Sequence, residues 1–244
     1  MGKILKTSAM IQSPLVRKHI PLTRWLNEET LTDMLKKHYT VFIKPDKGSG
    51  GYGIIRVRKT SKNLFEVIMG TKRQLVPQEN LMKYIQNFTR PFRSYLVQQG
   101  IKLSQYKGRP FDFRIYMQKP RNSWVVSGKV TRVAAPGRFL TNYHQGAKPV
   151  TVPEVLRSVL NNNKKVAEMI QQIGQLSLAT AQVLDAHFPG IRELGIDIAL
   201  EKSGKLWILE ANTSPACITF RLLPDKTMYH RILMNRRYIY NAYV

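Results

Sequence analysis

The stretch LGIDIALEKSGKLWILEANTSP, residues 194–215, carries the pattern that decides the fold. Two apolar runs, 194–200 and 206–211, flank a polar segment that contains Ser203-Gly204. Short apolar runs on either side of a glycine-containing turn are typical of a β-hairpin. We therefore expect two antiparallel strands joined by a two-residue turn at Ser203-Gly204.

This hairpin would bring two carboxylates together. With a two-residue turn, Asp197 lies directly opposite Glu210, with Cβ atoms about 4.5–5.5 Å apart. Because side chains alternate along a strand, Asn212 shares the face of Glu210, while Leu209 and Ala211 point to the opposite face. The pattern thus predicts two carboxylates and one amide oxygen in one place.

Opposed like charges destabilise a sheet unless something neutralises them. A divalent cation is one solution, since Mg²⁺ prefers oxygen ligands and is usually held by one or two carboxylates plus substrate phosphates. The sequence therefore predicts a metal site at Asp197, Glu210 and Asn212. The alternative is a pair of surface carboxylates neutralised by Lys202, Lys205 or an arginine elsewhere in the chain.

The composition is that of a strongly basic globular protein. With 244 residues and 43% apolar residues, the chain fits one large domain or two small subdomains. Thirty-nine Lys and Arg against 15 Asp and Glu give a formal net charge of +24. Such a charge favours anionic partners, namely nucleotide, RNA, an acidic peptide or an anionic surface. The basic residues are scattered, which argues against a single nucleic-acid-binding arm.

Cysteine content and hydropathy bear on the compartment. A single cysteine, Cys217, excludes an internal disulfide and suits a reducing cytoplasm. The first 18 residues show no signal-peptide core, because lysines and arginines interrupt their apolar positions. No apolar run approaches the roughly 20 residues of a membrane helix. We expect a soluble, cytoplasmic protein without a membrane span.

Further along the chain, strands and helices mix without a regular βαβ alternation, which predicts an α+β fold. An amphipathic lead-in covers residues 1–23, and Asn27 or Thr30 is placed to cap a helix. Helices are also expected at 81–88 and 166–187. The expected strands are 40–45, 54–58, 64–69, 95–99, 111–118, 123–133, 194–200 and 206–211.

A glycine-rich loop follows the strand at 40–45. The segment Lys44-Pro45-Asp46-Lys47-Gly48-Ser49-Gly50-Gly51-Tyr52-Gly53 lies between two expected strands. Glycines allow backbone N–H groups to surround phosphate oxygens, and a lysine adds a positive charge. The segment does not match a P-loop or a dinucleotide fingerprint, because both of those motifs lead into a helix and this loop leads into an expected strand. A phosphate-binding flap is one interpretation, and an ordinary glycine-rich hairpin loop is the other.

Other polar residues are placed to support such a site. On strand 111–118, Asp112, Arg114 and Tyr116 share a face. Arg114 could grip a phosphate through its guanidinium group, or simply pair with Asp112. Arg132 and Asn142 flank a turn-like segment that could line a substrate site.

Taken together, these segments resemble the ATP-grasp superfamily, and within it the endospore coat-associated YheC/YheD group. The resemblance covers most of the chain in the right order, and the last motif is the most specific. It rests on 42–45 with the glycine loop, 95–101 as a hinge, 111–114, 139–146, 194–198 and 209–215.

The resemblance implies two α+β subdomains that grip ATP within a single ATP-grasp domain spanning 1–244, with a smaller subdomain at about 24–96 and a larger one at about 97–244. It implies an ATP-dependent carboxylate–amine ligase acting through an acyl phosphate, with a peptide or amino acid as a conceivable substrate. The cofactors would be ATP and one or two Mg²⁺ ions.

By resemblance, residues of this chain also receive roles. Arg114, Arg132 and Asn142 would form the catalytic group, and Asp197, Glu210 and Asn212 would hold the metal. The nucleotide-binding residues would be Lys44, Gly48, Ser49, Gly50, Gly51, Gly53, Gln98, Gln99 and Ile101.

Three departures from the family pattern affect this interpretation. The subdomain that usually precedes the ATP-grasp core is largely missing from this sequence, which leaves the substrate open. A second nucleotide-binding lysine is represented only by the candidates Lys3 and Lys6. Gln98 or Gln99 stands where many relatives carry an acidic hinge residue.

Three functional hypotheses therefore remain open. The first is the ligase. The second is a spore-associated structural or binding protein that retains the fold with little turnover. The third is recruitment of RNA, such as an aminoacyl-tRNA, by the basic surface, with binding that weakens steeply as salt is added.

Overall fold

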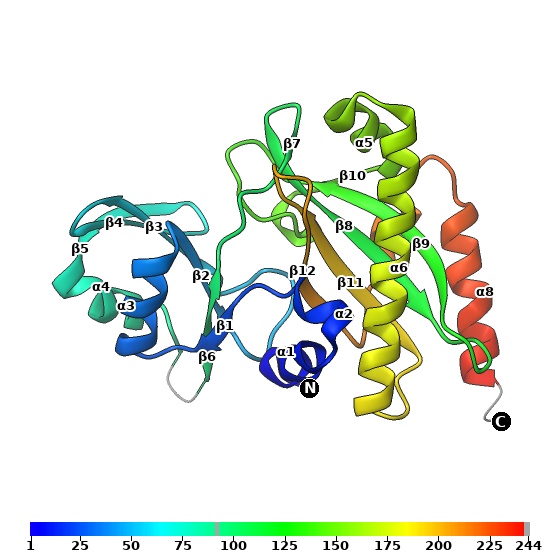
Figure 1. Cartoon of the computed structure of the whole chain (residues 1–244), viewed down its shortest axis with the longest axis horizontal. Helices are drawn as coiled ribbons and strands as arrows, with labels where there is room; N and C mark the ends of the chain where they lie inside the picture. Colours follow the sequence, from blue (N-terminus) through cyan, green and yellow to red (C-terminus); the bar gives the residue numbers. More distant parts are fainter. Residues whose placement is uncertain (91–92, 242–244) are drawn as a thin grey trace. The chain divides into compact units, whose positions relative to one another are not determined.

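The computed structural model describes residues 1–90 and 93–241, and its elements are α+β as expected. The chain divides into two compact units (Figure 1). Unit 1 comprises Met1–Thr7 and Pro21–Ile101, and unit 2 comprises Ser8–Ile20 and Lys102–Val244. The division falls after Ile101, since strand β6 (Tyr95–Gln99) is hydrogen-bonded to two other strands of unit 1.

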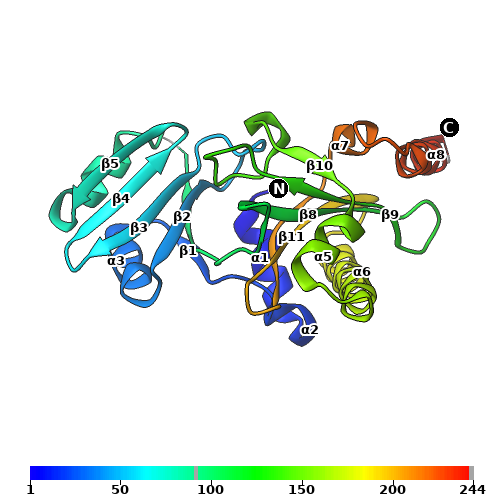
Figure 2. The same cartoon turned by 90° about the horizontal axis from the view of Figure 1, so that it is seen from above.

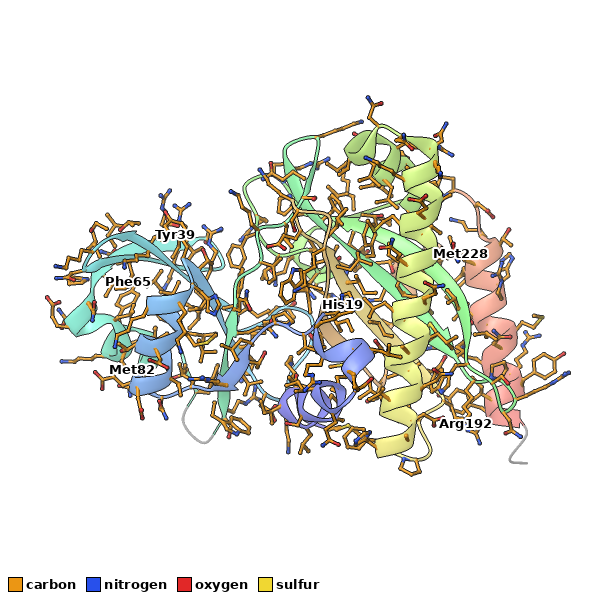
Figure 3. The ribbon with its side chains drawn as sticks, viewed as in Figure 1. His19, Tyr39, Phe65, Met82, Arg192 and Met228 are labelled. Carbon is orange, nitrogen blue, oxygen red and sulfur yellow. The ribbon has the colours of Figure 1, made fainter. Side chains whose placement is uncertain are left out.

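Unit 1 is built on an antiparallel sheet with strand order β1-β6-β2-β3-β4-β5. Helices pack on one face of the sheet, over a core that includes Phe65 (Figure 3). The elements are β1 (Thr23–Trp25), α3 (Glu28–Lys37), β2 (Thr40–Pro45), β3 (Ile55–Ser61), β4 (Leu64–Met69), β5 (Lys72–Pro77), a 3-10 turn (Gln78–Asn80), α4 (Leu81–Gln86) and β6.

Local sequence accounts for the main elements of unit 1. Asn27 and Thr30 both act at the start of α3, since the Thr30 N–H donates to Asn27 Oδ1 at 2.7 Å and the Asn27 N–H donates to Thr30 Oγ1 at 3.0 Å. Along β2, Val41 and Ile43 are fully buried against the helices. Lys44 is therefore presented on the opposite face of the sheet.

The residues expected to form a lead-in are mostly helical, in α1 (Lys3–Gln12) and α2 (Pro14–Arg17). Asp46, just after β2, caps the start of α1, because its Oδ1 accepts a hydrogen bond from the Ile4 N–H at 2.9 Å. A Cβ at Gly2 would lie 2.1 Å from Asp46 Oδ2. Glycine at position 2 thus allows this close contact.

Unit 2 contains a second antiparallel sheet, with order β10-β9-β8-β11-β12 and β7 paired to β8. Helices α5 and α6 cover one face, where Phe111, Phe113 and Ile115 lie in the main core. Helices α7 and α8 lie on the other face, against Tyr116 and Val130 (Figure 2). The elements are β7 (Gln105–Tyr106), β8 (Arg109–Gln118), β9 (Val125–Val133), a 3-10 turn (Tyr143–Gln145), β10 (Lys148–Val150), α5 (Val152–Leu160), α6 (Asn163–His187), β11 (Glu193–Leu200), β12 (Leu206–Asn212), α7 (Ile218–Arg221) and α8 (Thr227–Asn241).

The β11–β12 hairpin forms, but its turn differs from the expected one. The Gly204 N–H bonds to the Glu201 carbonyl at 2.9 Å, and Glu201 N–H bonds to Lys205 O at 2.9 Å. These bonds enclose a three-residue loop in which Gly204 has φ +90°. The prediction of a two-residue turn was therefore wrong. With the three-residue loop, Leu200 pairs with Leu206.

A bulge restores the expected pairing at the carboxylates. The register shifts between Asp197 and Ile198, so that Asp197 pairs with Glu210 while Ile198 pairs with Ile208. Leu209 is the extra residue of this β-bulge. Leu209 is only half-buried whereas Ala211 is buried, so the bulge at Leu209 interrupts the regular alternation that was expected to place both on the face opposite Glu210.

Candidate functional site

One face of the unit 2 sheet carries the charged residues that the sequence singled out. Asp112 on β8 pairs with Arg132 on β9, and Arg114 on β8 pairs with Asp197 on β11. Asp197 in turn pairs with Glu210 on β12. Four adjacent strands therefore bring these side chains together, on the side of the sheet opposite α5 and α6.

Arg132 is held between two buried carboxylates. Its Nε donates to Asp112 Oδ1 at 2.8 Å, and its Nη2 lies 2.9 Å from Asp197 Oδ2. The Thr141 hydroxyl donates to Asp112 Oδ2 at 2.7 Å. Only 5% of the Arg132 side chain is exposed. The geometry thus gives Arg132 a structural partner on each side within unit 2.

The environment changes the acidity of this cluster. Burial raises the pKa of the Asp112 carboxyl, and the neighbouring Arg132 opposes that rise. Burial also disfavours the charged form of Arg132, yet Asp112 and Asp197 together raise its pKa. For Arg114, burial and the like charge of Arg132 lower the pKa, while Asp197 acts in the opposite direction.

Asp197, Glu210 and Asn212 have the chemistry of a magnesium site. Asp197 Oδ1 is buried and accepts no hydrogen bond from the described residues, although Arg114 Nε lies 2.8 Å away. Asn212 Oδ1 accepts one hydrogen bond, from the Ser214 N–H at 2.9 Å, and an amide oxygen has a second lone pair. Two carboxylates and an amide oxygen fit a cation that takes its remaining ligands from phosphates and water.

This donor set is small. Within residues 1–90 and 93–241, no group of three or more His, Cys, Asp or Glu side chains is arranged to hold a metal. Asp197 is also neutralised by Arg114 and Arg132. The sequence left open that an arginine elsewhere in the chain neutralises the carboxylates, and for Asp197 two arginines do so.

Asn142 is the neighbour in sequence of Thr141, whose hydroxyl belongs to the same cluster. It precedes the 3-10 turn, and its carbonyl accepts a hydrogen bond from the Gln145 N–H at 2.9 Å. Its neighbour Thr141 is the residue that bonds Asp112. Cys217 is half-buried and packs beside the cluster of α7 and α8.

In unit 1, the glycine loop joins β2 to β3. Gly48, Gly50, Gly51 and Gly53 all have positive φ, from 70° to 145°, which side chains rarely allow. Lys3 Nζ donates to the Gly48 carbonyl at 2.9 Å. Of the two candidate lysines, Lys3 therefore contacts the loop, whereas Lys6 is buried.

Lys44 and the hinge glutamines are linked across the sheet of unit 1. Lys44 Nζ donates to Gln98 Oε1 at 2.6 Å, and Gln98 Nε2 donates to Thr23 Oγ1 at 3.0 Å. The Gln99 N–H donates to the Leu22 carbonyl at 2.8 Å. The side chain of Gln98 and the amide of Gln99 are thus engaged within the sheet.

Sequence reasoning missed several residues that shape the site. Asp112 was noted only as a neighbour of Arg114, although the alternation of 111–116 placed both on one face. Thr141 and Asp46 carried no signal, since each acts through a partner distant in sequence. Gly195 was also missed, and a Cβ there would lie 2.3 Å from Arg114 Nη1.

The two sheets, the glycine loop with its lysine and the carboxylate hairpin together define an ATP-grasp fold. Solved enzymes have a similar fold. The structure resembles the D-cycloserine synthetase DcsG with a TM-score of 0.59 at 9% identity, covering 97% of this chain and 70% of DcsG. It resembles an L-amino acid ligase from Bacillus licheniformis with a TM-score of 0.58 at 14% identity, covering 98% of this chain and 47% of the ligase.

The chain belongs to the YheC/D-like ATP-grasp family, whose match spans residues 1–243. Two curated proteins of Bacillus subtilis (strain 168) are similar to it. The endospore coat-associated protein YheD is 25% identical over 77% of this chain and 42% of YheD. The endospore coat-associated protein YheC is 24% identical over 83% of this chain and 55% of YheC.

The chain thus spans about half the length of the curated relatives that it matches. Within the described residues, no helix combines the length and the apolarity needed to cross a bilayer.

Proposed function

We propose that this chain binds Mg–ATP and transfers the terminal phosphoryl group to a carboxylate, leaving ADP and an acyl phosphate. An amine or a related nucleophile then attacks the acyl carbon and displaces inorganic phosphate. The observation that carries the proposal is the pairing of Asp197 with Glu210 beside Asn212, which places two carboxylates and an amide oxygen at neighbouring positions of one sheet face. Membership of the ATP-grasp family supports it.

In unit 2, the residues divide into ligands and supports. Asp197, Glu210 and Asn212 would hold one or two Mg²⁺ ions, which would neutralise and position the triphosphate. Arg114 would face the transferring phosphoryl group, since its side chain, at 13% exposed, is more accessible than that of Arg132. Arg132 would keep Asp197 in place through its pairing with both carboxylates.

In unit 1, the nucleotide-binding residues would act mainly through the backbone. Lys44 would bind phosphate oxygens, exchanging its bond to Gln98 for the anion. The amides of the glycine loop would surround the phosphates. Because the Gln99 amide is already bonded, we assign the adenine-facing backbone contact to Ile101. Gly48, Ser49, Gly50, Gly51 and Gly53 are the loop residues in this proposal.

Two solved relatives support a proposal for the substrate class. Besides the L-amino acid ligase, the structure resembles the ATP-grasp ligase PsnB in complex with a phosphomimetic variant of its minimal precursor, Mg and ADP. That likeness has a TM-score of 0.55 at 12% identity and covers 97% of this chain and 58% of PsnB. We infer that the substrate is a carboxylate of an amino acid or peptide, joined to an amine.

Calorimetry of ATP binding with and without Mg²⁺ tests the proposal. We expect Mg²⁺-dependent binding by the wild type and at least about tenfold weaker binding by Glu210→Gln, which keeps the side-chain shape but removes the charge. Glu168→Gln, at an exposed position of α6, is the matched control and should bind as the wild type does. ADP release with candidate carboxylates then measures turnover. An ATP affinity that is the same with and without Mg²⁺ and the same in Glu210→Gln would refute the assignment.

A second candidate function is a spore coat-associated binding protein that keeps the fold with little turnover. The names of the curated relatives and the neutralisation of Asp197 by two arginines favour it. The two functions differ in one readout. A structural protein would bind the nucleotide weakly or not at all and would release no ADP with any carboxylate and amine pair.

A further inference from the structure

Beside the charged residues, the unit 2 sheet carries a row of three residues that ends on the candidate metal ligand Asn212. Tyr116, Gly195 and Asn212 lie directly opposite one another on β8, β11 and β12. The row is adjacent to the one formed by Arg114, Asp197 and Glu210. The two rows are therefore immediate neighbours on the same face of the sheet.

The turn that follows β12 lies on this row. A Cβ at Gly195 would be 2.7 Å from Pro215 Cβ, so the absence of a side chain lets Pro215 approach the sheet. The same Cβ would lie 2.3 Å from Arg114 Nη1. Within the turn, Asn212 Oδ1 accepts the Ser214 N–H at 2.9 Å. The orientation of the Asn212 amide thus depends on the turn that Pro215 ends.

Arg236 of α8 anchors this turn. Its Nη2 donates to the Pro215 carbonyl at 3.1 Å and to the Tyr116 hydroxyl at 2.6 Å. Its Nε lies 3.0 and 3.2 Å from the two carboxylate oxygens of Glu193. The Tyr116 hydroxyl oxygen is also 3.0 Å from the Pro215 carbonyl. A single guanidinium group therefore joins the turn, β8 and β11.

Glu193 makes this anchor rigid. Its carboxylate is 6% exposed and also accepts hydrogen bonds from Gln118 at 2.8 Å and from Tyr240 at 3.1 Å. Gln118 additionally donates to the carbonyl of Ile232 in α8 at 3.1 Å. Near the start of α8, Met228 accepts a hydrogen bond from the Lys129 N–H at 3.3 Å (Figure 3). The helix is thus fixed to the sheet along its length.

We propose that Arg236 is a positioning residue for the metal site. Arg236 holds the Asn212–Pro215 turn so that the Asn212 amide oxygen faces the cation. This role rests on the proposed function. Arg236 touches neither nucleotide nor metal in it. Its effect passes through the Pro215 carbonyl and Tyr116, and a planar guanidinium is suited to bonding Glu193 and the carbonyl at once.

Substitution of Arg236 should separate metal binding from nucleotide binding. With ATP present, Arg236→Met should weaken Mn²⁺ binding, measured by electron paramagnetic resonance, by about tenfold, the lower end of what loss of a ligand's partner costs. ATP affinity without metal should be unchanged. Arg236→Lys keeps a charge near Glu193 but cannot bond Glu193 and the Pro215 carbonyl at once. Its Mn²⁺ affinity should therefore lie between those of the wild type and Arg236→Met. Arg237→Met, on the exposed side of the same helix, is the matched control.

A second measurement needs no metal. Amide hydrogen exchange over residues 206–217 should be faster in Arg236→Met than in the Arg237→Met control, because the turn loses its anchor. Tyr116→Phe retains the packed ring and removes the hydroxyl, so it should accelerate exchange in the same segment should Arg236→Met fail to fold. Far-UV circular dichroism identifies such a failure.

The outcomes are distinct. Wild-type protein that binds ATP without any dependence on divalent metal would overturn the proposed function and this role together. Wild-type Mn²⁺ binding that Arg236→Met leaves unchanged, with unchanged exchange in 206–217, would overturn the role of Arg236 alone. Faster exchange together with weaker metal binding and unaltered metal-free ATP affinity supports it.

Discussion

Replacing Arg132 by methionine should destabilise unit 2 strongly. In the wild type its guanidinium neutralises Asp112 and contributes to neutralising Asp197, and its side chain is 5% exposed. After the substitution, Asp112 would keep only the Thr141 hydroxyl among the contacts described above, in a buried environment. Methionine fills much of the arginine volume, so the change acts mainly through charge.

The expected magnitude follows from the loss of one partner of a buried ion pair. Such losses cost about 3–5 kcal/mol, because a buried charge is left uncompensated. Domains of this size are stable by only about 5–15 kcal/mol in total. Arg132→Met should therefore consume a large share of the free energy of unfolding, whereas an exposed arginine such as Arg157 should change it by less than about 0.5 kcal/mol on substitution by Met.

Urea unfolding followed by far-UV circular dichroism measures this difference. Adding Asp112→Asn to Arg132→Met removes the uncompensated charge, so the double variant should recover much of the lost stability. This recovery separates the charge effect from a packing effect. A loss below about 1 kcal/mol in Arg132→Met, or a double variant that is no better than the single one, would refute the reasoning.

Three further expectations come from individual contacts. Gly195→Ala should weaken Mg²⁺-dependent ATP binding in calorimetry, because its Cβ would lie 2.7 Å from Pro215 Cβ and push the turn after Asn212 away from the sheet. Glu66→Gln should destabilise unit 1 by about 3 kcal/mol in urea unfolding, since this fully buried carboxylate neutralises three arginines of β3 and β5. Burial and Glu193 raise the pKa of Tyr116 above its ordinary 10.0, so the unfolded chain loses that proton first and stability should fall as pH rises above about 10. Tyr116→Phe should lessen this fall.

The parts of the fold that the sequence predicted are those governed by local pattern. Period-two alternation located most strands, and the pairing of Asp197 with Glu210 was correct. The prediction of that pairing nevertheless assumed a regular hairpin, which the structure does not have. The loop has one residue more than expected, and the bulge at Leu209 compensates for it. Two local irregularities cancelled, and neither has a distinct sequence signature.

The elements missed by the sequence are those stabilised by distant partners. Helix α8 was not predicted, because its inward residues include Asn235, which bonds Ser127, and Arg236, which bonds Glu193. Such residues read as polar surface until their partners are known. Strand β5 was missed because its residues are mostly exposed at the sheet edge. Likewise α1 depends on a cap from Asp46, which lies after β2.

The charge balance of unit 2 has a consequence for the order in which ligands would bind. Asp112 and Asp197 are matched by Arg114 and Arg132, so this part of the site is nearly neutral by itself. Mg²⁺ arriving alone would meet two nearby guanidinium groups, which oppose it. A triphosphate brings negative charge that both the metal and Arg114 can share. We therefore expect weak binding of Mg²⁺ to the free protein and much tighter binding with ATP, whereas equal metal affinity in the two states would show that Arg114 and Arg132 do not govern the site.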